Sequence, residues 1–178
     1  LYFSVTKKEQ ARRFDRRRDD PLRQWKLSEI DVQAQEHWDD FTDMKYRMLT
    51  KTSTQDAPWT IIRSEDKHRA RLNAIRSILN AVPYEGRATD VDVVPDPEIV
   101  VSAAQEIALM EAERCRLCTR SPCVDACPVE IDIPRFIAAI RDGDLENAYS
   151  VIAERNVLPS ICGRVCAQDE QCEQRRPP

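Results

Sequence analysis

The chain has 178 residues, of which 42% are hydrophobic and 33% are charged, and its formal net charge is −4. This length suits one compact domain or two small ones, and the composition is typical of a globular protein and not of a disordered one. No apolar run is long enough to cross a bilayer and no signal peptide opens the chain, so we expect a cytoplasmic protein without a membrane partner.

Glycine is scarce, and this limits how the chain can hold a nucleotide. The sequence contains three glycines, Gly86, Gly143 and Gly163. A phosphate-binding P-loop needs several glycines with a Gly-Lys pair, and the dinucleotide fingerprint needs three in close spacing. The sequence therefore excludes both of these common phosphate-binding loops within residues 1–178.

Charge divides the chain into two parts of opposite sign. Residues 1–87 carry 18 Lys and Arg against 14 Asp and Glu, a net of +4, whereas residues 88–178 carry 9 against 17, a net of −8. All seven cysteines lie in the second part. This asymmetry indicates two units with different partners.

The first elements are a strand and a helix. Residues 1–5 are rich in strand formers, and Thr6 and Glu9 have the spacing of a capping box, which predicts a helix to about Arg18. Pro21 requires the helix to have ended, because the residue before proline avoids helical backbone angles.

A second helix, a strand and a third helix follow. Ser28 begins a helix to about Leu49, residues 59–62 form a strand, and Asp66 caps a helix that Pro83 ends. The apolar faces of the two helices are Ala34, Trp38, Phe41 and Met48, and then Leu72, Ile75, Leu79 and Val82. This order predicts the last part of a parallel α/β sheet, and because two strands do not make a stable sheet, we expect further sequence before Leu1.

We interpret residues 85–102 as a linker, because they contain Gly86, two prolines and little periodicity. Residues 103–114 read as a helix. A helical hairpin follows, with one helix from Asp132 to Arg141 and a partner from Asp144 to about Arg155. The predicted fold is therefore mainly α with a small parallel α/β remnant.

The cysteines form two groups. The first has the pattern C-x2-C-x4-C-x3-C-P and the second C-x3-C-x5-C; their members are Cys115, Cys118, Cys123 and Cys127, and then Cys162, Cys166 and Cys172. Soft thiolates in close spacing favour iron–sulfur ligation. A disulfide framework is disfavoured because the number is odd and nothing signals export, and zinc because only one C-x2-C pair occurs and neither His37 nor His68 is near it.

Residues 103–174 resemble the N-terminal iron–sulfur domain of the glutamate synthase small subunit, a domain that also begins dihydropyrimidine dehydrogenase. The resemblance rests on the first cysteine group and on the residues around both groups, namely 111–115, 131–134, 158–159 and 162–166. It implies an all-helical domain with two 4Fe–4S clusters that passes electrons between a flavin domain and a partner subunit, as in those oxidoreductases.

Carried over by position, the resemblance assigns Cys115, Cys118 and Cys123 to one cluster and Cys127, Cys166 and Cys172 to the other. The family has a further cysteine where this chain has Arg176, so each cluster lacks one ligand within residues 1–178. Cys162 is the candidate substitute ligand. The number of clusters, one or two, is left open. We describe the domain as residues 103–178, truncated at its C-terminal end.

The basic first part has a resemblance of its own. Residues 1–84 resemble the C-terminal part of the polyphosphate kinase 2 family, in the residues Tyr2–Val5, Gln10, Arg13, Phe14, Arg17, Asp20, Pro21, Trp25–Ser28, Asp31, Trp38, Ala57–Trp59, Asp66, Lys67 and Arg69–Asn73. The resemblance implies a P-loop kinase-like fold that moves a phosphoryl group between polyphosphate and a nucleotide with Mg²⁺. It also implies that Arg13, Arg17 and Lys26 belong to a phosphate-binding lid.

The family carries its P-loop, catalytic aspartate and Mg²⁺ loop earlier in the chain, so we expect no turnover by residues 1–178 alone and assign no catalytic residue. Nucleic acid is not expected, because no stacking platforms are recognised in the basic stretch and acidic residues interleave it. We interpret Trp25, Trp38 and Trp59 as core packing and not as substrate platforms.

Two hypotheses follow. The first is a fusion of a polyphosphate kinase-like segment with an iron–sulfur electron-transfer domain, which would have polyphosphate or nucleotide and a redox subunit or flavin domain as partners. The second is a non-enzymatic protein that binds polyphosphate or nucleotide and holds zinc or a single cluster as a structural metal.

Overall fold

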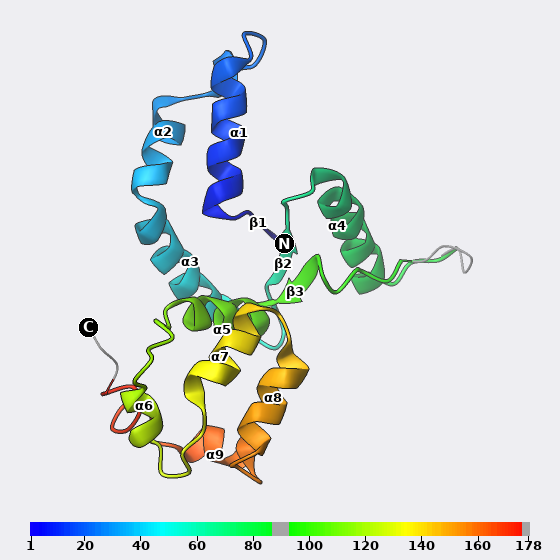
Figure 1. The fold of residues 1–178 in the computed structure, drawn as a ribbon. Helices are drawn as coiled ribbons and strands as arrows, with labels where there is room; N and C mark the ends of the chain where they lie inside the picture. Colours follow the sequence, from blue (N-terminus) through cyan, green and yellow to red (C-terminus); the bar gives the residue numbers. More distant parts are fainter. Residues whose placement is uncertain (87–92, 176–178) are drawn as a thin grey trace. The chain divides into compact units, whose positions relative to one another are not determined.

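The computed structural model describes residues 1–86 and 93–175, and the chain divides into two compact units, Leu1–Ile107 and Ala108–Pro178. Among the described residues, the strands all belong to the first unit and the second is built from helices and turns (Figure 1). The prediction of a mainly helical chain with a small sheet is confirmed. None of the described helices is both long enough and apolar enough to span a bilayer.

The first unit contains a small mixed sheet in the order β1-β2-β3. Strands β1 (Tyr2–Ser4) and β2 (Thr60–Arg63) run parallel, as predicted, and Phe3 lies opposite Ile62. Strand β3 (Val100–Ser102) adds to the other edge of β2 in the antiparallel direction. The sheet therefore differs from the expected parallel remnant by one antiparallel strand.

The core lies on both faces of β2, because successive side chains of a strand point to opposite faces. Ile61 packs with Leu49 of α3 (Trp38–Thr52), and Ile62 packs with Ala70 of α4 (Lys67–Ala81). Both isoleucines and Leu49 are fully buried. This alternation places one helix against each face of the central strand.

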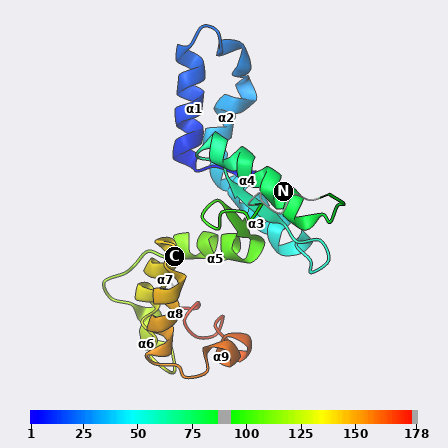
Figure 2. The same cartoon turned by 90° about the vertical axis from the view of Figure 1, so that its right-hand side faces the viewer.

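A helical arm is formed by α1 (Lys7–Asp19), the short 3-10 helix η1 (Gln24–Lys26) and α2 (Glu29–Glu36). Helices α1 and α2 lie side by side in both views (Figures 1 and 2). The single helix predicted from Ser28 to Leu49 is wrong, because the chain leaves helical geometry at His37, with φ −93° and ψ 20°, between α2 and α3.

Helix α4 begins at the predicted cap, where the Asp66 carboxylate accepts the backbone N–H groups of His68 and Arg69. Its predicted core face is not the observed one. Leu72 and Ile75 are 51% and 56% exposed, whereas the buried positions are Ala70, Asn73 and Ala74. Small side chains face the sheet because they allow the helix to approach it closely.

Residues 93–102, which the sequence analysis placed in a linker, belong to the first unit; the expected linker's residues 87–92 lie outside the described part. The side-chain oxygen of buried Asn73 accepts the backbone N–H of Asp96 at 2.7 Å, and Arg69 pairs with Asp96 and Glu98 at 2.7 and 3.0 Å. These contacts fix the segment that leads into β3. No local sequence pattern predicts the pairing of β3 with β2.

The second unit is organised around the predicted hairpin of α7 (Ile133–Arg141) and α8 (Leu145–Ala153). Asp132 and Asp144 cap the two helices, as expected. Gly143 takes a φ of +80°, and the hydrogen bonds from Gly143 N to Ile140 O and from Asp144 N to Ala139 O close a Schellman turn. Buried Ala139, Ala148 and Val151 fill the space between the helices.

Three further helices carry or adjoin the cysteines. They are α5 (Ala103–Glu113), which spans the division between the units, α6 (Pro122–Asp125) and α9 (Pro159–Val165). Proline stands in the first turn of both α6 and α9, where its missing N–H is tolerated.

A buried ion pair lies at the centre of the first unit. The Lys45 ammonium contacts the Glu106 carboxylate and donates to Ser4 Oγ at 3.2 Å, so α3, α5 and β1 are joined at one point. The side chains of Lys45 and Glu106 are 16% and 7% exposed. Removing one member of such a pair leaves a desolvated charge without its partner.

We therefore expect Glu106→Gln to lower the free energy of unfolding of the first unit by about 3 kcal/mol, measured by urea denaturation. The double change Lys45→Met with Glu106→Leu should recover most of the loss. Arg18→Ala is the control, because the exposed Arg18–Asp15 pair, with side chains 60% and 61% exposed, should contribute at most about 0.5 kcal/mol. Equal losses in Glu106→Gln and Arg18→Ala would contradict the central role of the buried pair.

Candidate functional site

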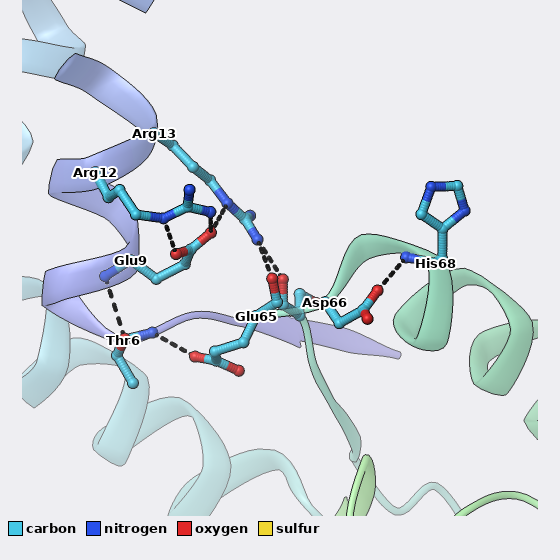
Figure 3. A network of polar contacts seen from close by, with 8 residues as sticks. Thr6, Glu9, Arg12, Arg13, Glu65, Asp66 and His68 are labelled. Carbon is cyan, nitrogen blue, oxygen red and sulfur yellow. Dashed lines mark hydrogen bonds and ion pairs between the residues drawn. The ribbon is translucent and has the colours of Figure 1, made fainter. Parts of the chain in front are cut away.

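The base of the helical arm is fixed by a network of hydrogen bonds (Figure 3). Thr6 Oγ1 accepts the backbone N–H of Glu9 at 3.2 Å, which is half of the predicted capping box. The other half is replaced, because the backbone N–H of Thr6 donates to the carboxylate of Glu65, 59 positions later, at 2.9 Å. A side chain from the turn between β2 and α4 thus completes the cap of α1.

Glu9 is free for a different role and binds two arginines. Its carboxylate accepts from Nε of Arg12 and Nε of Arg13, each at 2.7 Å. The hydrogen bond from Arg12, followed by that from Arg13, lowers the pKa of Glu9 from its ordinary 4.5 to about 2. Glu9 is therefore ionised throughout the neutral range and supplies negative charge to the first turn of α1, where the helix dipole favours it.

Arg13, one of the three expected phosphate-binding residues, also anchors the arm. Its Nη2 group donates to the carbonyl oxygens of Ser64 and Glu65, the latter at 3.1 Å. Two of the guanidinium nitrogens are thereby engaged by protein oxygens. Arg13 holds α1 against the turn that precedes α4, and this places the remaining arginines of α1 beside the start of α4.

The other two expected residues, Arg17 and Lys26, lie further along the arm. Arg17 Nη1 donates to the backbone oxygen of Lys26 at 3.4 Å and is 4.0 Å from the Asp31 carboxylate, so it links all three elements of the arm. Lys26 Nζ lies 5.0 Å from the ring centroid of Trp25. Arg13 and Arg17 are one helical turn apart, whereas Lys26 belongs to the distal turn.

The sequence analysis missed Lys67, the first residue of α4. Burial, followed by repulsion from Arg13, Arg17, Arg16 and Arg71, lowers the pKa of Lys67. These five side chains, Arg13, Arg16, Arg17, Lys67 and Arg71, are named the cation cluster below. The available signal was the i, i+4 spacing of Lys67 and Arg71 at the start of a helix that follows a strand.

Three members of the cation cluster have no carboxylate partner in the described part of the chain. Within residues 1–86 and 93–175, Arg16, Lys67 and Arg71 have no carboxylate oxygen within the 4.0 Å of an ion pair, and all three are exposed, whereas Arg13 and Arg17 are paired with Glu9 and Asp31. The N-terminal end of α4 adds its partial positive charge. Such a surface attracts an anion with several oxygens, such as a chain of phosphates.

The cysteines lie on the turns and short helices of the second unit, and all seven are free thiols. Cys115 follows α5, Cys123 lies in α6, and Cys162 lies in α9. Between Cys115 and Cys118, Leu117 adopts the left-handed conformation at φ +49°. A large residue held there is uncommon and is found where a loop is shaped around a ligand.

Thiols of the two groups influence one another. Burial raises the pKa of Cys123, and the charges of Cys115 and Cys172 raise it further. Burial likewise raises the pKa of Cys172, with added effects from Cys166 and Cys127. Cys172 of the second group therefore lies near Cys123 and Cys127 of the first group.

The donor set is chemically suited to iron, because soft thiolates ligate iron–sulfur clusters. In the described part of the chain, however, the cysteines are not gathered into any group of three or more ligands at metal-binding geometry. Cys118 and Cys162 complete the set of expected ligands, and Cys162 O accepts the backbone N–H of Cys166 at 2.8 Å. Arg176, the position where a further ligand was expected, lies outside the described residues.

Two family models match the chain. The polyphosphate kinase 2 model matches residues 1–90, half of the 178 residues, and the chain therefore belongs to this family. A model described as dihydropyrimidine dehydrogenase domain II, 4Fe–4S cluster, matches residues 96–176. The resemblance of the first part to the polyphosphate kinase 2 family and that of the second part to the 4Fe–4S domain of dihydropyrimidine dehydrogenase are confirmed.

Curated relatives match part of the chain. A GDP-polyphosphate phosphotransferase of Pseudomonas aeruginosa is 49% identical over 106 residues, which are 60% of this chain and 30% of the relative. An NDP-polyphosphate phosphotransferase 2 of Ruegeria pomeroyi is 51% identical over 110 residues, 62% of this chain and 32% of the relative. An ADP-polyphosphate phosphotransferase 3 of Rhizobium meliloti is 48% identical over 84 residues, 47% and 30% respectively. The chain spans about a third of the length of these relatives.

The depressed pKa of Glu9 predicts how acid affects the arm. A carboxylate whose folded-state pKa is lowered stabilises the fold above its unfolded pKa, and this contribution disappears as the pH falls through the folded value. The stability difference between the wild-type chain and Glu9→Gln should therefore be largest above about pH 5 and shrink as the pH falls from 4.5 towards 2. Chemical denaturation of both proteins across this range measures it, and a difference independent of pH would argue against the Glu9–Arg12–Arg13 contact.

Proposed function

We propose that the first unit binds polyphosphate and nucleoside phosphates through the cation cluster, as part of a polyphosphate phosphotransferase. The observation that carries this proposal is the convergence of four arginines of α1 and α4, Arg13, Arg16, Arg17 and Arg71, on Lys67. The relatives' names, which specify GDP, NDP or ADP and polyphosphate, support the choice of ligand. In this proposal the unit is the lid-bearing, C-terminal segment of a P-loop kinase-like fold.

The residues divide by their contacts. Arg16, Lys67 and Arg71 contact the phosphate oxygens, because the described structure shows them exposed and without a carboxylate partner. Arg17 and Lys26 act on phosphates at the outer end of the arm. Arg13 binds phosphate with the donors that Ser64, Glu65 and Glu9 do not use, and mainly positions α1.

The chemistry fits the relatives' reaction. Phosphoryl transfer depends mainly on positioning and on stabilising the negative charge that is spread over the transferred group. Cations held on a helical arm can supply such charge, and Mg²⁺ with the remaining kinase parts would supply the rest. The chain's own contribution in this proposal is to bind and orient the phosphate chain.

Substitution of the exposed cations tests this proposal. Lys67→Gln and Arg71→Gln should each weaken the binding of polyphosphate to the 178-residue chain about tenfold, or about 1.4 kcal/mol, because each removes a charge-assisted hydrogen bond. Added salt should weaken binding in all variants, since it screens exposed charges. Isothermal titration calorimetry with polyphosphate of defined length is the measurement.

Arg18→Gln is the matched control, because it also removes one positive charge from α1, but Arg18 is paired with Asp15 at 3.0 Å and does not contribute to the cluster around Lys67. It should change the affinity by less than about twofold. Equal weakening by Arg18→Gln and Lys67→Gln would mean that net charge alone attracts the ligand, and the proposed site would be wrong.

We further propose that the second unit holds one or two 4Fe–4S clusters and passes electrons to a redox subunit or flavin domain. The 4Fe–4S family match over residues 96–176 and the mutual influence of thiols from both groups favour this function. Cys115, Cys118 and Cys123 would hold one cluster, Cys127, Cys166 and Cys172 the other, and Cys162 would fill a missing position.

Metal analysis tests the second proposal. Anaerobically prepared chain should be brown and contain iron and sulfide in near-equal amounts, and Cys123→Ser should lower both. Ser160→Ala, an exposed change on α9, is the control and should leave both unchanged. Colourless protein with stoichiometric zinc would instead support a structural metal site and contradict the electron-transfer function.

A further inference from the structure

The distal end of the helical arm is a well-fixed turn. Asp20 accepts the backbone N–H of Leu22 at 3.0 Å and pairs with Arg23 at 2.9 Å. The side-chain amide of Gln24 donates to the backbone oxygen of Arg18 at 2.8 Å. These contacts join the turn to the end of α1, so the residues of η1 are held in a defined orientation.

This turn presents an aromatic ring to solvent. Trp25 is 77% exposed, although we expected it to lie in the core with Trp38 and Trp59. The expectation holds for Trp59, which packs against the cluster around Leu49, and it is wrong for Trp25. The indole N–H of Trp25 donates to the backbone oxygen of Leu22 at 3.0 Å, so the polar edge of the ring is satisfied within the turn.

Positive charge surrounds this ring. Lys26 Nζ lies 5.0 Å from the centroid of the Trp25 ring, within the range of a cation–π contact. The backbone oxygen of Lys26 is bound by Arg17, and Arg17 belongs to the cation cluster around Lys67. An exposed aromatic surface and a phosphate-attracting surface are therefore connected through one arginine.

We propose that Trp25 is a stacking platform for the base of a nucleotide whose phosphates are held by Lys26 and Arg17. The assignment rests on the proposed function, and it adds a base-binding site that the cation cluster alone does not provide. Base stacking on an aromatic side chain is favourable and independent of base identity, and fixing the ring in advance reduces the entropy lost on binding. Charge complementarity selects a nucleotide over an uncharged aromatic ligand.

A single nucleotide fits this site better than a nucleic-acid strand. Binding of a strand uses several aromatic side chains on which successive bases stack. The arm, residues 7–36, has two aromatic residues, and the other, Phe14, is 8% exposed in the interior of the unit. One exposed ring can therefore stack with one base. The positive charges of the neighbouring cations are complementary to the negative charge of a diphosphate group.

The test compares two ligands that differ by the nucleoside. GDP and pyrophosphate are titrated into the 178-residue chain by calorimetry, with the wild type, Trp25→Leu and Trp25→Phe. Trp25→Leu should weaken GDP binding about tenfold and pyrophosphate binding less than twofold, and Trp25→Phe should retain most of the GDP affinity. Because Trp25 is largely exposed, its replacement should leave the circular dichroism spectrum unchanged.

Phe41→Leu is the matched control, since Phe41 is an aromatic residue of the same unit, 61% exposed, but lies on α3 and outside the turn. It should alter neither affinity. Tryptophan fluorescence gives a second readout: GDP should quench the wild-type emission more than that of Trp25→Phe, in which the ring that stacks on the base is replaced.

The outcomes separate the two proposals. Equal weakening of GDP and pyrophosphate in Trp25→Leu, or unchanged GDP affinity, would overturn the stacking platform while leaving the phosphate site in place. Failure of the wild type to bind pyrophosphate or polyphosphate would overturn the proposed function itself. A loss of self-association in Trp25→Leu, seen by sedimentation with unchanged GDP affinity, would assign the ring to an interface between copies and would also refute the platform.

Discussion

The candidate phosphate site depends on one side chain, Arg13, which ties two segments that are far apart in the sequence. Its guanidinium binds the carbonyl oxygens of Ser64 and Glu65 and the carboxylate of Glu9. Glu65 strengthens the same junction from the other side by accepting the backbone N–H of Thr6. Without this junction nothing local would hold α1 beside the start of α4, and the cations of the two helices would not converge.

This junction works against electrostatic repulsion. Like charges repel one another, and this repulsion, after desolvation, contributes to the lowered pKa of Lys67. The protein places its compensating carboxylate, Glu9, on the inner arginines Arg12 and Arg13 and leaves the outer cations without one among the described residues. Negative charge thus stabilises the scaffold, while positive charge remains available to a ligand.

Local chemistry made much of the fold predictable. Thr6, Asp66, Asp132 and Asp144 begin their helices as expected, because a capping side chain acts within three residues of itself. Gly143 ends α7 for an equally local reason, since its left-handed backbone angle closes the Schellman turn. The parallel pairing of β1 and β2 followed from the order of the elements.

The structural predictions were wrong where contacts with segments distant in the sequence determine the structure. The segment leading to β3 looks like a linker, but a buried side chain of α4, Asn73, fixes its backbone and β2 offers it an open edge. The apolar stripe of α4 predicted the wrong face, because the sheet accepts the smaller side chains of Ala70 and Ala74. The break at His37 carries neither glycine nor proline to mark it.

The residues of the candidate site, like the elements of the fold, were predictable from the sequence only in part. Arg13 and Arg17 of the cation cluster were named as phosphate-binding residues from the family pattern, whereas Arg16 and Arg71 were not. Lys67 was missed, because its membership of the cluster depends on how the arm folds back on the turn before α4. Trp25 was misplaced because hydrophobicity alone assigns a tryptophan to the core, whereas here Leu22 takes its N–H and the turn leaves its ring in solvent.

The charge asymmetry of the sequence gains a physical meaning from these sites. Residues 1–87, with a net charge of +4, contain the whole cation cluster, and residues 88–178, with −8, contain every cysteine. A polyanion is attracted to the first part and repelled by the second. Iron–sulfur ligation would add further negative charge as thiols become thiolates, because the metal binds the deprotonated form. The proposed phosphate site and the cysteines therefore lie in parts of the chain with opposite net charge.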